Sequence, residues 1–404
     1  MDMLAEKKII LCISQMSGGG AERIACVLMN EFKKRGTYPS VFLTNQTAGE
    51  ADRRNLDESI PVTGYGDASD AVGSIKRFGY KLLRIFSSAV CKVSENLKRE
   101  VPAYFAYLSF FSQYYGQIGK LRNILKSNPD MTVIAFLQPS IPIALLSARG
   151  LKNRVIFSER GDPVRLMKKR FGRKFIEKYY SRADCAVFQT EDAKNTYPEN
   201  IAEKGVVIFN PISPELPEPY DGGRSKNITT FCRISRQKNL PLLIDAFKNV
   251  HKDYPDYKLR IIGSPQNADD ESVFEDIKKQ ISDLSLEESV IFEPFSKDVH
   301  SLIIKDAVYV NSSDYEGMSN AMLEAMAIGL PCVCTDCSIG GANAVIKDGE
   351  NGLLVKLGSA DELSKAIKKV ISDKSLADTL SANGRKIRDE LKIENISKQW
   401  MELV

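Results

Sequence analysis

The stretch from Asn311 to Gly352 constrains the fold more than any other part of this 404-residue chain. It follows an apolar run, Ala307–Val310, that is typical of a buried strand, and it turns at Glu316-Gly317. A helix is predicted from Ser319, and a second strand-like run follows at Leu330–Cys334. Strand, loop, helix and strand make one βαβ unit, and such sheets bind ligands at the carboxyl ends of their strands.

The loop of this unit carries groups suited to phosphate and to hydroxyls. Met318, Ser319 and Asn320 lie at the predicted helix start, where unpaired backbone N–H groups and the helix dipole favour an anion. Glu316 and Glu324 flank that position, and because carboxylates repel phosphate we expect them to bind hydroxyls of a ribose and a sugar ring. The apolar residues of the helix are predicted to pack in the core, whereas ionised glutamates rarely lie in an apolar element without a partner.

These residues resemble the donor-site signature of the retaining glycosyltransferases of family 4. The shared pattern is a glutamate, seven residues and a second glutamate, here Glu316 and Glu324, then an EAMA-G-P run that ends at Pro331 and an Asp-Gly-x-Asn-Gly turn at 348–352. This chain departs from the pattern at Ala344, where the family often has a further glutamate near the donor.

The resemblance implies the GT-B fold, an α/β architecture of two Rossmann-like, doubly wound domains that face a cleft. In that fold the last helix crosses back to the first domain, and Trp400 is placed to anchor it. The resemblance also implies that Glu324 binds the ribose and that Glu316 binds hydroxyls of the donor sugar.

Length and composition agree with two globular domains. Hydrophobic residues make up 43% of the chain and charged residues 27%, which argues against extensive disorder, and the net charge of +4 gives no electrostatic case for nucleic acid. Proline and glycine crowd the chain after the apolar run Val206–Ile212, which marks a linker. We therefore place a domain boundary at residue 212. The resemblance makes 1–212 the acceptor-side domain, 213–385 the donor-binding domain and about 386–404 a helix that returns to the first domain.

Cysteine usage and hydropathy indicate a cytoplasmic protein, soluble or peripheral, and the family resemblance would place any peripheral contact on the inner face of the cell membrane. The eight cysteines are scattered, many inside apolar runs, as expected for reduced core residues. Cys332, Cys334 and Cys337 lie close together but lack an evident fourth ligand, so we predict no metal site there. No signal peptide is expected, and no run reaches the roughly 20 apolar residues that span a bilayer.

A glycine-rich turn follows the first predicted strand, Lys8–Ser14. Gly18, Gly19 and Gly20 would let backbone approach a ligand closely, although a tight strand-to-helix turn explains them equally well. Many family 4 transferases open with a similar segment, so the resemblance makes these glycines candidates for lining the cleft near the donor phosphates.

Residues 75–115 combine basic and aromatic side chains in an amphipathic pattern. The pattern fits an element that lies on a membrane surface, and it fits equally a helix pair packed on the domain core with solvated lysines. Many relatives use lipid-linked acceptors, which is the main reason to consider membrane contact.

A polar turn, Ser158-Glu159-Arg160, follows another predicted strand of the first half and makes Glu159 and Arg160 acceptor-side candidates. Many family members carry an important histidine in this half. Here the only histidines are His251 and His300, both in the second half, so no histidine role is transferred.

Two cations and an aromatic residue follow strands of the second half. Arg233 and Lys238 lie around the end of the predicted strand Ile228–Ser235, where they can converge on a diphosphate, although each alone would more often be a surface charge. The family pattern of an arginine and a lysine followed by an asparagine, here Asn239, favours the binding role. The turn at Phe295 resembles the place where relatives hold the nucleotide base.

Departure of a diphosphate builds negative charge that the site must stabilise. The sequence has no Asp-x-Asp motif for a divalent metal, and Arg233, Lys238 and the helix start at 318–320 can supply the stabilisation, so we expect no metal or other cofactor. The resemblance implies a retaining reaction in which the leaving phosphate helps deprotonate the acceptor. Arg233, Lys238 and Glu316 are the predicted catalytic residues.

The sequence therefore predicts a glycosyltransferase that moves a hexose or N-acetylhexosamine from a nucleotide sugar to a growing glycan. UDP is the first choice of nucleotide and GDP the second, and family analogy suggests a polyprenyl-linked acceptor in assembly of bacterial capsule or lipopolysaccharide. Two alternatives stay open: a nucleotide-sugar epimerase of GT-B fold, and a non-catalytic, membrane-associated assembly subunit. A dinucleotide oxidoreductase is disfavoured because neither half has the glycine fingerprint followed by its ribose acid.

Overall fold

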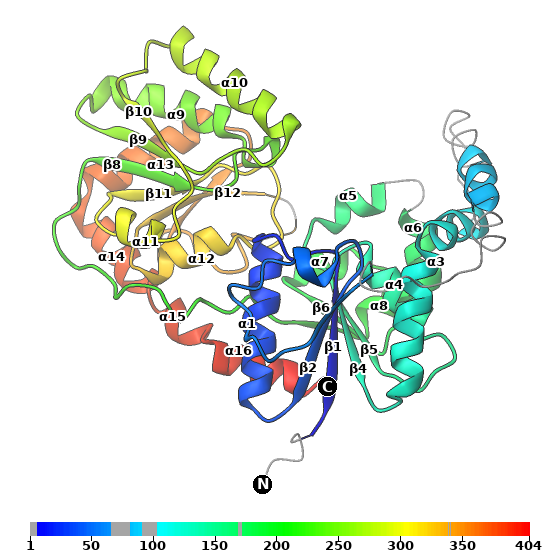
Figure 1. Cartoon of the computed structure of the whole chain (residues 1–404). Helices are drawn as coiled ribbons and strands as arrows, with labels where there is room; N and C mark the ends of the chain where they lie inside the picture. The colour runs from blue at the N-terminus through cyan, green and yellow to red at the C-terminus, as the bar shows by residue number, and fades with distance from the viewer. Residues whose placement is uncertain (1–5, 66–80, 91–102, 169–171, 338, 340) are drawn as a thin grey trace. The chain divides into compact units, whose positions relative to one another are not determined.

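The computed structural model describes residues 6–65, 81–90, 103–168, 172–337, 339 and 341–404 (Figure 1). The chain divides into two compact units, with unit 1 formed by Met1–Phe209 and Ile393–Val404 and unit 2 by Asn210–Lys392. The chain thus leaves unit 1 after Phe209 and returns to it at Ile393.

Unit 1 is built on a seven-stranded parallel sheet with the order β3-β2-β1-β4-β5-β6-β7 (Figure 1). Its central strands are apolar runs that are buried on both faces, as all-parallel sheets require. The strands are β1 (Lys8–Ile13), β2 (Tyr38–Leu43), β3 (Val62–Gly64), β4 (Thr132–Phe136), β5 (Val155–Ser158), β6 (Cys185–Phe188) and β7 (Gly205–Val207).

The helices of unit 1 pack apolar faces on this sheet. Ile24, Leu28 and Phe32 recur at helical spacing on α1 and are almost fully buried. Besides the helical residues 81–90, the described helices are α1 (Gly20–Lys34), α3 (Ala103–Ser127), α4 (Ser140–Ser147), α5 (Pro163–Lys168), α6 (Gly172–Tyr179), α7 (Glu191–Asn195), α8 (Glu199–Ala202) and α16 (Ile393–Met401), with short 3-10 turns at Ala48–Glu50 and Tyr180–Arg182.

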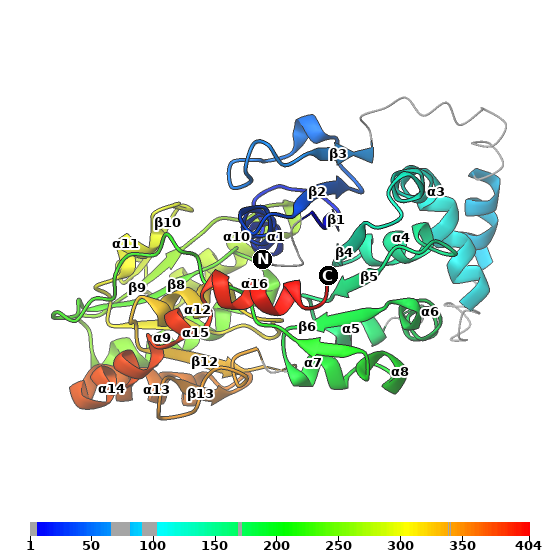
Figure 2. The same cartoon turned by 90° about the horizontal axis from the view of Figure 1, so that it is seen from below.

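The C-terminal helix α16 belongs to unit 1, which confirms the predicted crossing back. Figures 1 and 2 both show it beside α1, and Arg35 of α1 donates to the carbonyl of Glu394 at 3.0 Å. Trp400 is fully buried, with its ring 5.8 Å from that of Phe136 on β4. A large aromatic side chain in the core thus holds the end of the chain to the first sheet.

Unit 2 is built on a six-stranded parallel sheet with the order β10-β9-β8-β11-β12-β13. Because the order reverses direction between β8 and β11, the loops after these two strands meet at a topological switch point. The strands are β8 (Asn227–Phe231), β9 (Lys258–Ile262), β10 (Val290–Glu293), β11 (Val308–Asn311), β12 (Cys332–Asp336) and β13 (Leu353–Lys356).

Helices cover both faces of the second sheet, with α9 and α10 on one side of it in Figure 1 and α11 and α12 on the other. Leu363, Ile367 and Val370 of α13 form one apolar face and join the core of aliphatic strand residues. The helices are α9 (Leu240–Asp253), α10 (Ala268–Asp283), α11 (Val299–Ile303), α12 (Asn320–Ala327), α13 (Ala360–Ser372), α14 (Lys374–Gly384) and α15 (Ile387–Glu390). Two parallel α/β domains of this kind are the predicted architecture, which is confirmed.

Two predicted strands have different bounds in the structure. The strand predicted at Leu330–Cys334 begins at Cys332, because Gly329 ends α12 with a φ of 80° and Pro331 has no N–H to give to a ladder. The strand predicted at Ile228–Ser235 ends at Phe231, where the chain leaves the sheet for the loop that carries Arg233.

The basic and aromatic stretch at 75–115 lies partly outside the described residues. Within it, residues 81–90 are helical and expose Leu82, Ile85 and Phe86. In the described part of the chain, none of the helices combines the length and the hydropathy that crossing a bilayer would require.

Candidate functional site

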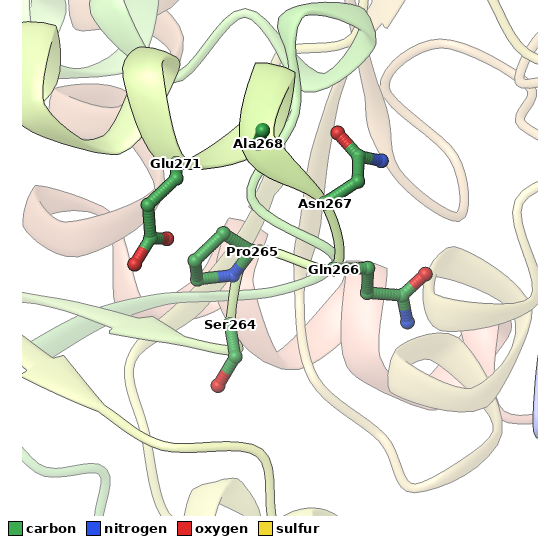
Figure 3. Close-up of a pocket in the computed structure, with 6 residues that line it drawn as sticks. All are labelled: Ser264, Pro265, Gln266, Asn267, Ala268 and Glu271. Atoms are coloured by element: carbon green, nitrogen blue, oxygen red, sulfur yellow. The ribbon is translucent and has the colours of Figure 1, made fainter.

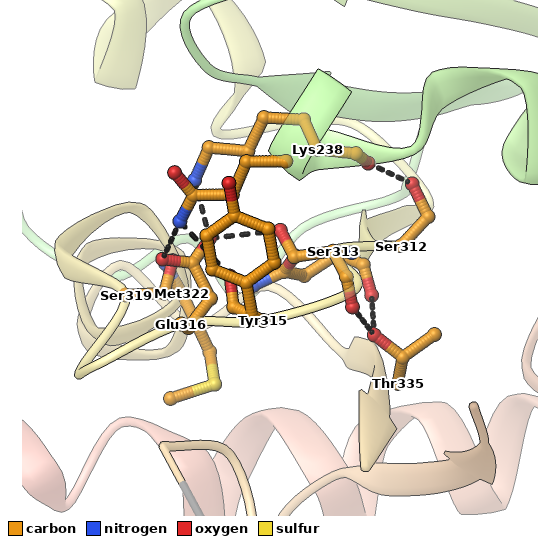
Figure 4. Close-up of polar contacts among 10 residues, drawn as sticks. Lys238, Ser312, Ser313, Tyr315, Glu316, Ser319, Met322 and Thr335 are labelled. Atoms are coloured by element: carbon orange, nitrogen blue, oxygen red, sulfur yellow. Dashed lines mark hydrogen bonds and ion pairs between the residues drawn. The ribbon is translucent and has the colours of Figure 1, made fainter. Parts of the chain in front are cut away.

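The predicted residues Lys238 and Glu316 meet at the carboxyl edge of the second sheet. Lys238 ends a 3-10 turn, Arg236–Lys238 (η4), after β8, and Glu316 lies in the loop after β11. The ammonium of Lys238 and the carboxylate of Glu316 form a hydrogen-bonded ion pair (Figure 4). Neighbouring strands at the switch point thus bring together two residues that lie 78 positions apart in the sequence.

The carboxylate of Glu316 is buried and accepts further hydrogen bonds. The Ser313 hydroxyl donates to it at 2.8 Å, and the Gln237 amide donates at 3.1 Å. Burial acts to lower the pKa of Lys238, but the charge of Glu316 and their hydrogen bond outweigh it, so the pKa of the ammonium lies above its ordinary value. Lys238 therefore stays charged in this site at neutral pH.

Hydrogen bonds connect the loop after β8 with the loop after β11. The Ser312 hydroxyl donates to the carbonyl of Lys238 at 2.9 Å, and the Asn239 amide donates to Asp314 at 2.6 Å. Asn239 takes a left-handed conformation, with φ 42°, and its side chain caps α9 by accepting from the N–H of Leu242 at 3.3 Å. The cap fixes where η4 ends, and with it the position of Lys238.

Helix α12 begins directly after this loop. Ser319 is its N-cap and accepts a hydrogen bond from the N–H of Met322 at 3.3 Å (Figure 4). Met318 is buried beside the cap, and Asn320 accepts from the Asn210 amide at 2.6 Å. The helix start predicted from the sequence thus lies next to the Lys238–Glu316 pair.

Glu324, one turn further along α12, has a partner that the sequence analysis missed. The Nε2 atom of His300 on α11 lies 3.0 Å from the carboxylate of Glu324, and both side chains are largely buried. The sequence analysis assigns His300 no role, because this histidine falls outside the N-terminal half. No local pattern signals the contact, since the two residues lie on different helices 24 positions apart.

Arg233 lies near the carboxylate of Asp270, whereas Lys238 pairs with Glu316. Its Nε lies 3.7 Å from the carboxylate of Asp270 on α10, and its side chain is 43% exposed. The structure therefore brings Lys238 and Glu316 into contact and leaves the guanidinium of Arg233 at the solvent-exposed side of the same sheet edge.

A pocket of about 380 Å³ lies at the carboxyl end of β9 (Figure 3). It is lined by Ser264, Pro265, Gln266, Asn267, Ala268 and Glu271. Phe295, the predicted base-side residue, is next to it, because its N–H reaches the Ser264 hydroxyl at 3.5 Å. Phe295 is 72% exposed.

Gly341, in the loop after β12, closely approaches the loop that carries Glu316. A Cβ atom at position 341 would stand 2.1 Å from the carbonyl oxygen of Gly317 and 3.5 Å from the Cα of Met318. Only a residue without a side chain allows this approach, so the loop after β12 fixes the backbone on which Glu316 is presented.

We expect Gly341→Ala to displace the Glu316 loop and lower turnover by roughly tenfold or more, since small misplacements of binding groups are costly. Gly223→Ala is the matched control, because a Cβ there meets nothing within 4 Å. Steady-state kinetics of both variants test this. Equal activity of the two would show that the close approach at Gly341 does not position the loop.

The glycine-rich turn of unit 1 forms the N-terminus of α1. Gly19 is the N-cap and Gly20 the first helical residue, while Gly18 has a φ of 90°. The Glu22 carboxylate folds back and accepts from the N–H groups of Ser17 at 2.6 Å and Gly19 at 2.8 Å. The Glu22 carboxylate therefore already accepts hydrogen bonds from backbone N–H groups of the turn that the sequence predicts to lie near the donor phosphates.

Glu159 and Arg160 are both buried at the carboxyl edge of β5. Glu159 accepts from the N–H groups of Arg160 and Gly161, each at 3.1 Å, and its burial raises its pKa. The Arg160 guanidinium lies 4.2 Å from the centroid of the Phe136 ring, and burial lowers its pKa to about 9. These two predicted acceptor-side residues thus make internal contacts within unit 1.

Comparison with known proteins gives a family match in unit 2. Residues 222–387 match the family described as glycosyl transferases group 1. Over 356 residues the chain is 25% identical to an uncharacterized glycosyltransferase of Haemophilus influenzae, covering 86% of this chain and 93% of that protein.

A second relative has a defined acceptor in its name. The chain is 22% identical over 400 residues to an alpha-1,4-N-acetyl-D-galactosaminyltransferase of Campylobacter jejuni that acts on a diphospho-undecaprenol-linked glycan, covering 98% of both chains.

Solved structures of similar proteins share the fold over the whole chain. The Anabaena protein Alr3699/HepE in complex with UDP superposes with a TM-score of 0.74 at 17% identity, covering 98% of both chains. TarM superposes with a TM-score of 0.74 at 15% identity, covering 100% of this chain and 99% of TarM. At these identities the likeness concerns the fold, which is GT-B.

Proposed function

We propose that this chain, a GT-B protein whose residues 222–387 form a group 1 glycosyl transferase domain, transfers a sugar from a nucleotide donor to a glycan in polysaccharide biosynthesis. More specifically, the donor is a UDP-linked hexose or N-acetylhexosamine, and the acceptor is a lipid-linked glycan. The transfer retains the anomeric configuration and uses no metal.

The observation that carries this proposal is the Lys238–Glu316 pair at the start of α12. A largely buried cation, with 17% of its side chain exposed, lies beside a helix N-terminus and provides positive charge where a diphosphate can leave. Such preorganised charge stabilises a developing anion. A buried carboxylate next to it accepts hydrogen bonds from sugar hydroxyls. One edge of one sheet therefore holds groups for both halves of a nucleotide sugar.

Other residues at the same edge of the sheet bind the rest of the nucleotide sugar. Glu324 binds the ribose from the second turn of α12, and Glu316 binds hydroxyls of the transferred sugar. The base lies against Phe295 and the pocket lined by Ser264 and Gln266. Support for this arrangement is the order of the strands, which places the pocket, the cation and the helix start along one edge of the sheet.

In the reaction, the acceptor oxygen forms a bond to the anomeric carbon on the face from which the phosphate leaves. The bond from that carbon to the phosphate oxygen breaks, and the leaving phosphate takes the acceptor proton. Lys238 and the N–H groups at 318–320 stabilise the charge on the departing diphosphate, and Arg233 adds a longer-range positive charge from its exposed position. This arrangement supplies the stabilisation that an Asp-x-Asp metal site provides in other transferases, and the sequence has no such motif.

A lipid-linked acceptor is supported by the Campylobacter relative, whose own acceptor is linked to diphospho-undecaprenol. It also fits the exposed apolar residues Leu82, Ile85 and Phe86, which alternate with Lys81 and Arg84 on one helical segment. A cationic helix with an exposed apolar side suits the surface of an anionic membrane.

The test is a thermal-shift series with UDP, GDP, ADP, dTDP and their sugars, with and without EDTA. A ligand of the native state stabilises it by mass action, by about 2.7 kcal/mol when its concentration is 100 times its Kd. We expect UDP to raise the melting temperature, and we expect the rise to persist in EDTA. Absence of any nucleotide effect on the folded protein would contradict the proposed function, and a rise that EDTA abolishes would contradict metal independence alone.

A further inference from the structure

His300 is placed to control the carboxylate that the proposed function assigns to the ribose. Its Nε2 lies 3.0 Å from the carboxylate of Glu324. A carboxylate only accepts hydrogen bonds, so Nε2 carries the proton and donates it toward Glu324. The second ring nitrogen is turned away from this contact by the geometry of the imidazole.

The imidazole of His300 is held on several sides. The ring of Phe231, the last residue of β8, meets it edge to face at 5.5 Å between centroids. Val299 and Ile303 on the same short helix are buried and fix α11 against the unit. The side chain of His300 is only 13% exposed, so its ring has little room to change rotamer.

The imidazole of His300 also connects two parts of the site. Phe231 ends the strand that leads to the loop of Arg233 and Lys238, and Glu324 lies on the helix that follows the Glu316 loop. The ring of His300 therefore contacts both the end of β8 and α12, the elements that lead to the Lys238 side and carry the Glu324 side of the site.

We propose that His300 is a positioning residue that orients the Glu324 carboxylate toward the ribose of the nucleotide, and that it acts on donor binding through Glu324 alone. This inference rests on the proposed function, because it takes the ligand to be a ribonucleoside diphosphate. His300 itself does not touch the reacting atoms. His300 therefore affects the affinity for the nucleotide. The rate of the chemical step is unchanged once the nucleotide sugar is bound.

The experiment measures UDP binding by calorimetry in five proteins: wild type, His300→Leu, His300→Gln, Glu324→Gln and the double variant His300→Leu/Glu324→Gln. His300→Leu removes the hydrogen-bond donor to Glu324 and keeps an apolar side chain against Phe231. We expect UDP affinity to fall by about tenfold, as for loss of a hydrogen bond to a charged group. His300→Gln keeps an N–H donor near the position of Nε2 and should retain most of the affinity. The double variant His300→Leu/Glu324→Gln should bind no worse than Glu324→Gln.

His251 provides a matched control in the same unit. It lies on α9 beside Phe247 and contacts the Ser289 hydroxyl through Nε2 at 3.2 Å, before the amino end of β10 and therefore at the opposite edge of the sheet. His251→Leu removes a comparable contact and should leave UDP affinity unchanged.

UDP analogues that lack the 2′- or 3′-hydroxyl separate positioning from general damage to the site. For the analogue without the hydroxyl that Glu324 binds, His300→Leu should no longer weaken binding relative to wild type. An equal loss for UDP and both analogues, or a loss of thermal stability with unchanged UDP affinity, would overturn the role of His300 and leave the proposed function standing. A wild-type protein that binds no ribonucleoside diphosphate would overturn both.

Discussion

Glu316→Gln is expected to lower turnover by about 100-fold or more while UDP still binds. The neutral amide keeps the shape of the side chain but presents an N–H where the carboxylate offers an acceptor, so the donor sugar loses its orientation. The nucleotide contacts come from other residues, and UDP affinity should therefore change little. Steady-state turnover and UDP binding on the same preparation check both parts.

Asp306→Asn controls for the loss of a buried charge in the same unit. Asp306 precedes β11, at the edge of the sheet opposite to Glu316, and its buried carboxylate pairs with Arg260 at 2.8 Å. This variant should lose stability but keep its turnover per folded molecule. Equal turnover loss in the two variants would mean that Glu316 matters only for folding.

Lys238→Met is expected to have the larger effect, with turnover lowered by about 1,000-fold and stability by roughly 3–5 kcal/mol. The turnover loss follows from removing the charge that faces the departing diphosphate. The stability loss follows because the Glu316 carboxylate remains buried without its cation. Activity assays and chemical denaturation measure the two effects separately.

The double variant Lys238→Met/Glu316→Gln distinguishes these causes. It removes both charges, so we expect much of the stability to return while turnover stays low. Lys248→Met, on the exposed side of α9, is the matched control and should change neither quantity. Recovery of turnover in the double variant would contradict a catalytic role for Lys238.

Much of the fold was predictable because its strands are buried on both faces. Thr132–Phe136 and Cys185–Phe188 are continuous apolar runs that indicate a strand without any reference to partners. Strand ends were less predictable, as at Ile228–Ser235, where the chain leaves the sheet at Phe231 while the apolar pattern continues. Buried loop residues next to a strand, such as Ile234, extend the pattern beyond the ladder.

The site was predictable as a set of residues but not as a set of contacts. Glu316, Glu324 and Lys238 stand out by residue type and motif, whereas their pairing depends on which strands are neighbours. The order β8-β11 joins Lys238 to Glu316, and the packing of α11 on α12 joins His300 to Glu324. The role of Gly341 likewise exists only where two loops of the folded unit approach each other.

Hydrogen–deuterium exchange of the protein with and without UDP tests most directly whether the carboxyl edge of the second sheet is the nucleotide site. We expect slower exchange in peptides that cover residues 233–240, 264–271 and 312–326, and no comparable change at the amino edge around Asp306. Protection confined to unit 1, or absent from residues 312–326 under conditions where UDP binds, would contradict the assignment of Lys238, Glu316 and Glu324 to the donor.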